Sequence, residues 1–339
     1  MTETSILSIV VPVYNETEVI DAFYERMTAV ARSLPFAAYE ILFIDDGSAD
    51  DTWARVRGYA ERDPAIRPLK LSRNFGHQAA ITAGLDHARG DCVVIIDSDL
   101  QDPPEVVPEM VARWREGYDV VYGRRSSREG EGRMKLLTAS AFYRLLNRLT
   151  RINIPVDVGD FRLLSRRAAD QLRGLREQDR FVRGLVSWIG FRQTGVTYAR
   201  DRRYAGDTKY PFRRMMNFAL DGITSFSTVP LKLAMWLGYA ASALAFIYLV
   251  SVFVQKFILQ NTIQGWATIM VALLFLGGVQ LICIGIMGEY IGRIFNEIKG
   301  RPLYVVEEFL DDSAHDTAGV DGPSAHPDPA PPPAWAGRA

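Results

Sequence analysis

Two long uncharged segments near the carboxyl end constrain this chain more than any other feature of its sequence. Leu233 to Val254 and Trp266 to Met287 contain no charged residue, and each is long enough to cross a bilayer, which takes about 20 residues in an α-helix. The connection between them carries a single charge, whereas arginine and lysine residues precede and follow the pair. Because basic residues collect on the cytosolic side of membranes, we expect two spanning helices with both flanks in the cytosol.

The start of the chain has none of the features of a signal peptide. Met1 to Val13 has no basic residue before its apolar run. The 39 basic and 40 acidic side chains give a formal net charge of -1, so the charge balance provides no reason to expect nucleic acid as a partner. Cys92 and Cys283 both lie in apolar runs. We interpret them as small buried side chains rather than as a disulfide or metal pair, which suits a reducing cytosol.

Between Ser5 and Val121, short runs of β-branched residues alternate with longer segments of helical pattern. The strand-like runs are SILSIVVPVY, EILFIDD, RPLKLS, CVVIID and DVVYG. Apolar strands separated by helices indicate a mostly parallel sheet with helices on both faces. We therefore predict a doubly wound α/β domain, in which the binding site lies beyond the carboxyl ends of the strands, where the strand order reverses.

Polar clusters occur at the ends of these strand-like runs. They are Tyr14-Asn15-Glu16, Asp45-Asp46-Gly47-Ser48, Ser72-Arg73-Asn74 and Asp97-Ser98-Asp99. Neither a GxGxxG nor a P-loop pattern accompanies them, so any nucleotide is held differently from a dinucleotide or a kinase-type ATP. Carboxylates two residues apart at a strand end can converge on Mg²⁺ or Mn²⁺, which in turn holds a diphosphate. The structural alternative for the second cluster is an Asx turn that caps the following helix.

These motifs, in this order, resemble the large inverting GT-A glycosyltransferase family, which includes cellulose synthases, chitin synthases and dolichol-phosphate mannose synthases. The resemblance extends from about Leu7 to Glu307 and is closest to the polyprenyl-phosphate branch with its GtrB-like bactoprenol glucosyl transferases. It also rests on LSRNFGHQAAITAGLDHARGD, DVGDFRLLSRR, DGITSFSTVPLKLA and GEYIGRIFNEIKGRPLY. The resemblance implies inverting transfer of a single sugar, with UDP-glucose as the expected donor and an undecaprenyl-type polyprenyl phosphate as the acceptor. Mg²⁺ or Mn²⁺ is the implied cofactor.

Carried over position by position, the resemblance assigns residues to three roles. The implied nucleotide-sugar contacts are Pro12, Tyr14, Glu16, either Asp45 or Asp46, Arg73, Asn74, Gly76 and Asp97. The implied metal ligands are Asp97, Asp99 and Gln101. The implied catalytic residues are Asp97, Asp99 and Asp160, with Asp157 as an alternative to Asp160.

The acceptor side is predicted from two amphipathic patterns. Apolar residues recur at helical spacing within Lys135 to Arg151, opposite three arginines, and again from Phe212 to Ile223. A helix that packs on the core of its own domain shows the same spacing. Because the two expected spanning segments are nearby, the alternative is that these helices lie in the membrane interface. The residues expected to face the acceptor phosphate are Arg124, Arg125, Arg203 and Lys209. Arg203 and Lys209 match the R-x-x-G-x-S/T-K element of the family.

The expected acceptor also bears on the mechanism. A phosphate monoester has a second pKa of about 6, so near neutral pH it is largely a dianion and needs no strong general base. Asp160 is accordingly expected to orient the acceptor, or to hold metal or sugar, rather than to remove a proton.

The donor has alternatives to UDP-glucose, which are GDP-mannose or another UDP-sugar.

Two other functions compete with this interpretation. A processive polysaccharide synthase usually carries a Gln-x-x-Arg-Trp element and a multi-helix channel, and the sequence contains neither. A non-catalytic membrane protein that binds or flips lipid-linked sugars is the second alternative. Asp97, Asp99 and Gln101 argue against it.

These patterns divide the chain into five segments. They are a GT-A domain (1–209), a juxtamembrane amphipathic helix (210–230), two transmembrane helices with a short outer loop (231–292), a cytosolic segment (293–310) and a Pro- and Ala-rich tail (311–339) that is expected to be disordered. We expect a multi-pass protein of the bacterial plasma (inner) membrane with a cytosolic catalytic domain. The spacing of Gly288 and Gly292 is typical of helices that pack between subunits, so a homo-oligomer is expected.

Overall fold

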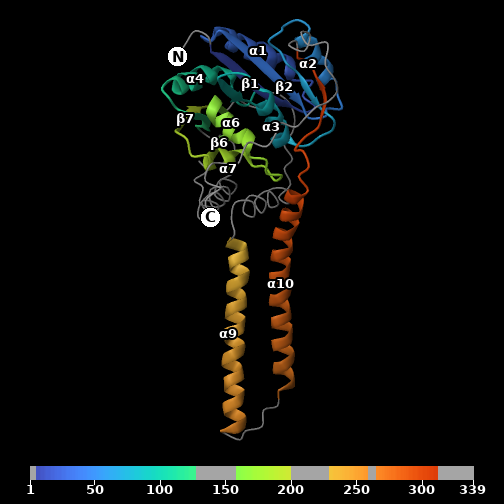
Figure 1. The fold of residues 1–339 in the computed structure, drawn as a ribbon, viewed down its shortest axis with the longest axis vertical. Coiled ribbons are helices and arrows are strands. Elements are labelled where there is room, and N and C mark those ends of the chain that lie inside the picture. The colour runs from blue at the N-terminus through green and yellow to red at the C-terminus, as the bar shows by residue number, and fades with distance from the viewer. Residues whose placement is uncertain (1–4, 127–157, 200–228, 259–264, 312–339) are drawn as a thin grey trace, which may run out of the picture.

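The computed structural model describes residues 5–126, 158–199, 229–258 and 265–311. These residues form an α/β domain and a pair of long helices, α9 (Val229–Phe257) and α10 (Trp266–Ile298), which project from one end of the domain (Figure 1). The amphipathic patterns within 135–151 and 212–223 and the tail from 312 onward lie outside the described residues.

One mixed sheet forms the centre of the described α/β domain. Its strands are β1 (Ile6–Val13), β2 (Ala38–Asp45), β3 (Leu69–Leu71), β4 (Cys92–Ile95), β5 (Val120–Arg125), β6 (Val158–Ser165), β7 (Gln193–Tyr198) and β8 (Val306–Phe309). In space they follow the order β7-β5-β6-β4-β1-β2-β3-β8. Strands β4, β1, β2 and β3 are parallel, whereas β6 is antiparallel to β4 and β5, and β8 is antiparallel to β3. The predicted doubly wound fold is confirmed, and the chain order reverses between β4 and β1.

Helices cover both faces of this sheet (Figure 1). One layer contains α1 (Ile20–Ser33), α2 (Thr52–Ala60) and α4 (Val107–Arg115), which follows the short 3₁₀ helix η1 (Pro104–Val106). The other contains α3 (His77–His87), α6 (Arg166–Gly174) and α7 (Val182–Trp188). Ile9 and Val11 of β1 belong to the first core and Val10 to the second. Successive side chains of a strand point to opposite faces, so a strand buried on both faces must be apolar throughout.

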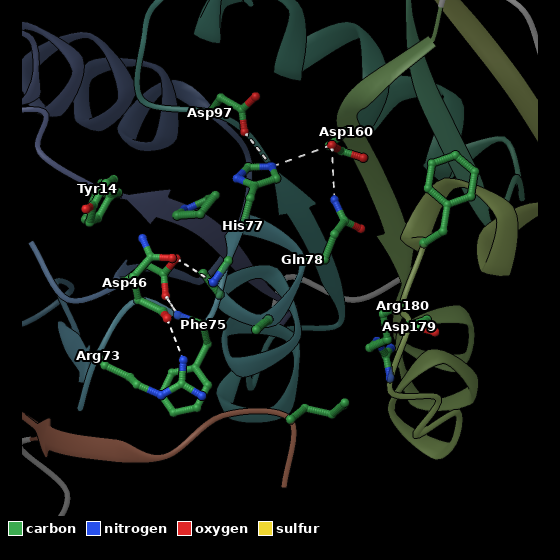
Figure 2. A pocket seen from close by; sticks show the side chains of 18 of the residues that line it. Tyr14, Asp46, Arg73, Phe75, His77, Gln78, Asp97, Asp160, Asp179 and Arg180 are labelled. Carbon is green, nitrogen blue, oxygen red and sulfur yellow. Dashed lines mark hydrogen bonds and ion pairs between the residues drawn. The ribbon is translucent and has the colours of Figure 1, made fainter. Parts of the chain in front are cut away.

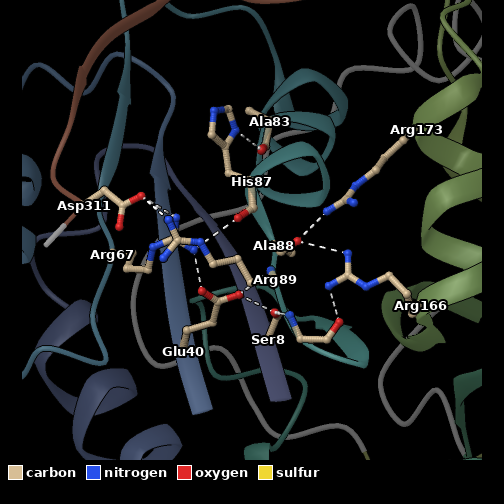
Figure 3. A network of polar contacts seen from close by, with 11 residues as sticks. Ser8, Glu40, Arg67, Ala83, His87, Ala88, Arg89, Arg166, Arg173 and Asp311 are labelled. Atoms are coloured by element: carbon tan, nitrogen blue, oxygen red, sulfur yellow. Dashed lines mark hydrogen bonds and ion pairs between the residues drawn. The ribbon is translucent and has the colours of Figure 1, made fainter. Parts of the chain in front are cut away.

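The sequence pattern does not predict β8, which is formed by the chain that follows α10. Leu69 of β3 pairs with Phe309 of β8. Just beyond the strand, Asp311 lies 3.0 Å from the Nη2 of Arg67, and Arg67 also forms an ion pair with the buried Glu40 (Figure 3). The chain after the second long helix is thus part of the α/β domain.

The two helices expected to span a membrane are both present. Val229–Val254 and Val271–Ile298 have mean hydropathies of 2.0 and 2.3, and only 6% and 0% of their most apolar windows are buried by protein. Both are long and apolar enough to cross a membrane, and apolar surface of this extent is unfavourable in water. Gly288 and Gly292 of α10 face open space in the single chain, so the homo-oligomer stays a prediction.

Candidate active site

A cleft of about 1350 Å³ lies at the carboxyl ends of β1, β2 and β4. Tyr14 follows β1, Asp46 follows β2, Asp97 follows β4, and all three line the cleft (Figure 2). The cleft therefore occupies the edge of the sheet where the chain order reverses, as expected for a doubly wound domain.

The turns after β1 and β2 hold each other in place. The N–H of Asn15 donates to the Oγ of Ser48 over 3.0 Å, and the N–H of Ala49 donates to the Oδ1 of Asn15 over 2.9 Å. Asn15 has a positive φ of 55°, which costs energy for a residue other than glycine. The Tyr14 side chain next to this turn is 47% exposed and offers an aromatic face to the cleft. Such a face suits stacking on a nucleobase.

The two aspartates after β2 have different surroundings. Asp45 does not line the cleft; it is fully buried and accepts hydrogen bonds from the N–H and the hydroxyl of Ser48. Asp46 lines the cleft and accepts from the N–H groups of Phe75 (2.7 Å) and Gly76 (2.9 Å). Burial raises the pKa of both carboxyls, although these hydrogen bonds oppose the rise. Asp46 thus holds the 73–76 loop in the cleft wall, and Asn74 of that loop lines the cleft.

Gly47 allows this loop to come close. Its φ is 73°, and a Cβ atom added there would lie 2.6 Å from the carbonyl carbon of Arg73 and 2.7 Å from the backbone nitrogen of Asn74. Glycine is the only residue that fits both the backbone conformation and the space.

The Asp97-Ser98-Asp99 turn follows β4 and continues through Leu100, whose φ is 57°. Asp97 and Asp99 line the cleft, whereas Gln101 does not; its N–H donates to the Oδ1 of Asp99 over 3.1 Å. Burial raises the pKa of Asp97 to about 6; His77 opposes the rise, and the carboxylates of Asp160, Asp102 and Asp99 add to it.

A divalent cation fits this position. Among the described residues, the buried Oδ1 of Asp97 makes no hydrogen bond, although it lies 3.4 Å from the Nε2 of His77. A cation would satisfy this oxygen and offset the clustered negative charge. No group of three His, Cys, Asp or Glu side chains forms a metal cage within the described part of the chain. Mg²⁺ is usually bound by one or two carboxylates, with substrate phosphates and water completing its coordination.

Asp160 of β6 lies at the centre of a polar network in the cleft. Arg183 donates two hydrogen bonds to it, from Nε over 2.9 Å and from Nη2 over 3.0 Å. His77 lies between Asp160 and Asp97, 3.5 Å from the Oδ2 of Asp160 (Figure 2). Burial raises the pKa of Asp160, but Arg183, His77 and Arg162 outweigh it and hold the pKa well below its usual value. The carboxylate therefore stays ionised near neutral pH.

Several cleft residues are not predicted by the sequence. Gln78 of α3 donates to Asp160 over 3.5 Å and accepts from the N–H of Val182, which joins α3 to α7. Arg183 and the segment from Arg301 to Leu303 also line the cleft. His77 and Gln78 lie within the motif LSRNFGHQAAITAGLDHARGD, and Arg301 lies within GEYIGRIFNEIKGRPLY, but the resemblance assigns none of the three a role. No local pattern separates Arg183 from a solvated charge.

The residues expected to bind the acceptor phosphate are only partly described. Arg124 and Arg125 do not line the cleft. The Nη2 of Arg125 lies 3.5 Å from the Oδ1 of Asp102, and the guanidinium of Arg124 lies 5.9 Å from the centre of the Tyr122 ring. Arg203, Lys209 and Asp157 lie outside the described residues.

Comparisons with known proteins match both parts of the chain. The profile of Glycosyl transferase family 2 matches residues 8–173, and that of the GtrB C-terminal hairpin matches residues 229–294. The glycosyltransferase YkcC of Bacillus subtilis is 50% identical over 89% of this chain and 93% of its own length. The SfII prophage-derived bactoprenol glucosyl transferase of Shigella flexneri is 43% identical over 89% and 97%.

Solved structures are more distant. Glucosyl-3-phosphoglycerate synthase of Mycobacterium tuberculosis, solved with Mn²⁺, UDP-glucose and phosphoglyceric acid, has a TM-score of 0.44 to this chain. The two are 23% identical, and the match covers 65% of this chain and 78% of the other.

Proposed function

The chain belongs to glycosyl transferase family 2 and is a glycosyltransferase, and from this premise we propose that it transfers a single sugar from a nucleoside diphosphate donor onto a polyprenyl phosphate at the cytosolic face of the plasma membrane. One observation carries the proposal. The 43% identity to a bactoprenol glucosyl transferase extends over 89% of the chain, so it includes both the cleft and the helix pair. The name of that relative supports glucose as the sugar and an undecaprenyl-type acceptor, and the family resemblance adds UDP as the nucleotide.

Donor binding is assigned to the side of the cleft formed by β1, β2 and β4. The exposed ring of Tyr14 is suited to the base, and Pro12, Glu16 and Asn74 line the cleft around it. Asp46 acts by fixing the 73–76 loop. Asp97 and Asp99 would hold Mg²⁺ or Mn²⁺, which when bound supplies positive charge beside the departing diphosphate. Gln101, expected as a third ligand, does not line the cleft, and its N–H donates to Asp99.

The reaction places its main demand on positioning. An oxygen of the acceptor phosphate forms a bond to the anomeric carbon, the bond from that carbon to the diphosphate breaks, and its electron pair leaves with the nucleoside diphosphate. The acceptor is largely a dianion near neutral pH and has no proton that a base must remove. Asp160, which stays ionised in its pair with Arg183, suits a positioning role in which it orients Arg183 and His77. Attack opposite the leaving group inverts the anomeric centre.

The test is transfer of radiolabel from nucleotide sugars into an organic-extractable lipid. Detergent-purified protein, undecaprenyl phosphate and Mg²⁺ or Mn²⁺ are incubated with labelled UDP-glucose, another UDP-sugar or GDP-mannose. We expect label from UDP-glucose that is lost in Asp99→Ala and with EDTA. Label from another donor alone would change only the choice of sugar. Absence of label with every donor would favour a non-catalytic protein that binds lipid-linked sugars.

A further inference from the structure

The chain that leaves the second membrane helix forms part of the cleft wall. Arg301, Pro302 and Leu303 follow α10 and line the cleft, which also contains Tyr14 and Asp97. In Figure 1, α10 meets the α/β domain at its carboxyl-terminal end and the chain then continues upward into the domain. This wall is therefore the part of the cleft that is continuous with the membrane helices.

Contacts on the amino-terminal side fix this segment to the loop that precedes α7. Arg293 of α10 lies 2.7 Å from the Oδ2 of Asp179. The N–H of Gln178 donates to Glu297 over 3.0 Å, and the side-chain amide of Gln178 donates to the backbone carbonyl of Arg301 over 2.6 Å. The end of the helix and the backbone at Arg301 thus share one anchor.

Contacts on the carboxyl-terminal side fix it to the sheet and to α3. The hydroxyl of Tyr304 donates to Asp86 over 2.8 Å, and the N–H of Ser72 donates to the carbonyl of Val305 over 2.9 Å. Strand β8 follows directly. Just beyond it, Asp311 forms ion pairs with Arg67 and Arg89, which hold this end of the segment on the domain (Figure 3). Arg301 is therefore held at a defined place on the wall by contacts on both sides.

The other arginines of the cleft already have protein partners. Arg183 is paired with Asp160. Arg180 donates to the carbonyls of Leu172 and Leu175. Arg73 donates to the carbonyl of Asn74 and lies 3.9 Å from the centre of the Phe75 ring.

Arg301 differs from them. Its side chain is exposed, and within the described part of the chain its guanidinium makes no hydrogen bond or ion pair. Its planar fork of donors matches the oxygens of a phosphate, which it can bind through two hydrogen bonds.

We propose that Arg301 binds the phosphate group of the polyprenyl phosphate acceptor when it enters the cleft from the membrane side. The inference rests on the proposed function and adds a residue that holds the acceptor. A diphosphate of the donor offers the same chemistry, but the donor side of the cleft is built by Tyr14 and Asp97 at the ends of β1 and β4. The part of the cleft wall that contains Arg301 instead follows directly from α10, so it is next to the membrane side from which a lipid-borne phosphate enters.

The experiment compares Arg301→Gln and Arg301→Lys with Lys299→Gln. Lys299 is a basic residue of the same segment that does not line the cleft; its ammonium lies 4.0 Å from the centre of the Phe295 ring. The KM for undecaprenyl phosphate is measured in nanodiscs at saturating UDP-glucose, and the Kd for UDP is measured by calorimetry. Native mass spectrometry of undecaprenyl phosphate bound to each protein provides a readout that needs no turnover.

For Arg301→Gln we expect the KM for undecaprenyl phosphate to rise about tenfold or more, as for the loss of a charge-assisted hydrogen bond, while the Kd for UDP is unchanged. Arg301→Lys keeps the charge but loses the planar pair of donors, so its KM for undecaprenyl phosphate should lie between those of the wild type and Arg301→Gln. The KM of Lys299→Gln should match that of the wild type. A weaker Kd for UDP with an unchanged lipid KM would overturn the proposal in favour of the donor diphosphate. An equal effect in Lys299→Gln would also overturn it, in favour of general surface charge.

Failure of the proposed function has a different signature. In that case the wild-type protein transfers no sugar from any donor, and lipid binding in the mass spectrometer still decides the role of Arg301. Equal retention of undecaprenyl phosphate by the wild type and Arg301→Gln would reject the inference alone.

Discussion

Replacing Asp160 with asparagine tests whether the polar network in the cleft is built around one buried charge. The substitution preserves the shape of the side chain and removes its charge. Asp160 is 6% exposed, and it faces Arg162, which is 2% exposed, as well as Arg183 and His77. Burial lowers the pKa of Arg162 to about 10, so this guanidinium stays charged and would lose its nearby carboxylate.

The expected cost follows from that burial. Removing one partner of a buried ion pair costs about 3 to 5 kcal/mol, because the remaining charge is left uncompensated. For a domain of about 150 to 250 residues, each 1 kcal/mol lowers Tm by about 2 to 4 °C. Asp160→Asn should therefore lower Tm by about 6 to 20 °C.

The assay is scanning fluorimetry in detergent, with Asp170→Asn as the matched control. Asp170 also pairs with an arginine, Arg173, at 2.9 Å, but its side chain is 47% exposed. Exposed pairs contribute about 0 to 1 kcal/mol, so the control should change Tm by no more than about 4 °C. Equal Tm changes in the two variants would refute the idea that Asp160 compensates a buried charge.

The same variant also tests how Asp160 takes part in transfer. Because its pKa lies well below the usual value, Asp160 is ionised throughout the neutral range. With a divalent cation holding Asp97 ionised, the rate should then rise with pH about a midpoint near 6, set by the acceptor phosphate. Asp160→Asn should lower the rate without moving this midpoint. Loss of the midpoint in the variant would indicate that Asp160 itself exchanges the proton.

Three further changes have defined outcomes. Gly47→Ala should weaken UDP binding in calorimetry, because a Cβ atom would lie 2.6 Å from the backbone of Arg73; an unchanged Kd would show that the loop can move without cost. EDTA should abolish transfer, and Mn²⁺ or Mg²⁺ should restore it; metal-independent turnover would contradict the role assigned to Asp99. Arg167 lowers the pKa of Asp119, so this carboxylate contributes stability that is complete above about pH 4 and lost as pH falls through its folded-state pKa. The Tm difference between wild type and Asp119→Asn should therefore shrink in acid, and a constant difference would refute the linkage.

Much of the fold follows from local sequence. The alternation of apolar strands and helices predicts the doubly wound sheet, because strands such as β1 and β4 are buried on both faces and must be apolar throughout. The two helices that are long and apolar enough to cross a membrane are also local features, since length and absence of charge define them. The positions of Tyr14, Asp46 and Asp97 follow from the rule that such strands end at a common edge.

The parts of the fold and of the site that the sequence does not predict depend on contacts between segments far apart in the chain. β8 is a short, partly exposed edge strand that alternates little in polarity, and its pairing with β3 arises only when the chain returns from α10. Arg183 and Arg301 reach the cleft through α7 and through the anchored segment after α10. Arg183 has no periodic or motif signal, and the motif that contains Arg301 assigns it no place in the cleft. The spacing of charges in the sequence cannot show which of them share a cavity.

The most direct test of the central claim is the structure of the lipid product. Undecaprenyl phosphate and UDP-glucose are incubated with the enzyme, and the extracted lipid is examined by mass spectrometry and by NMR of the anomeric centre. We expect one hexose joined through the lipid phosphate, with the anomeric configuration inverted relative to the donor. A product with several sugars, or one that retains the configuration of the donor, would contradict it.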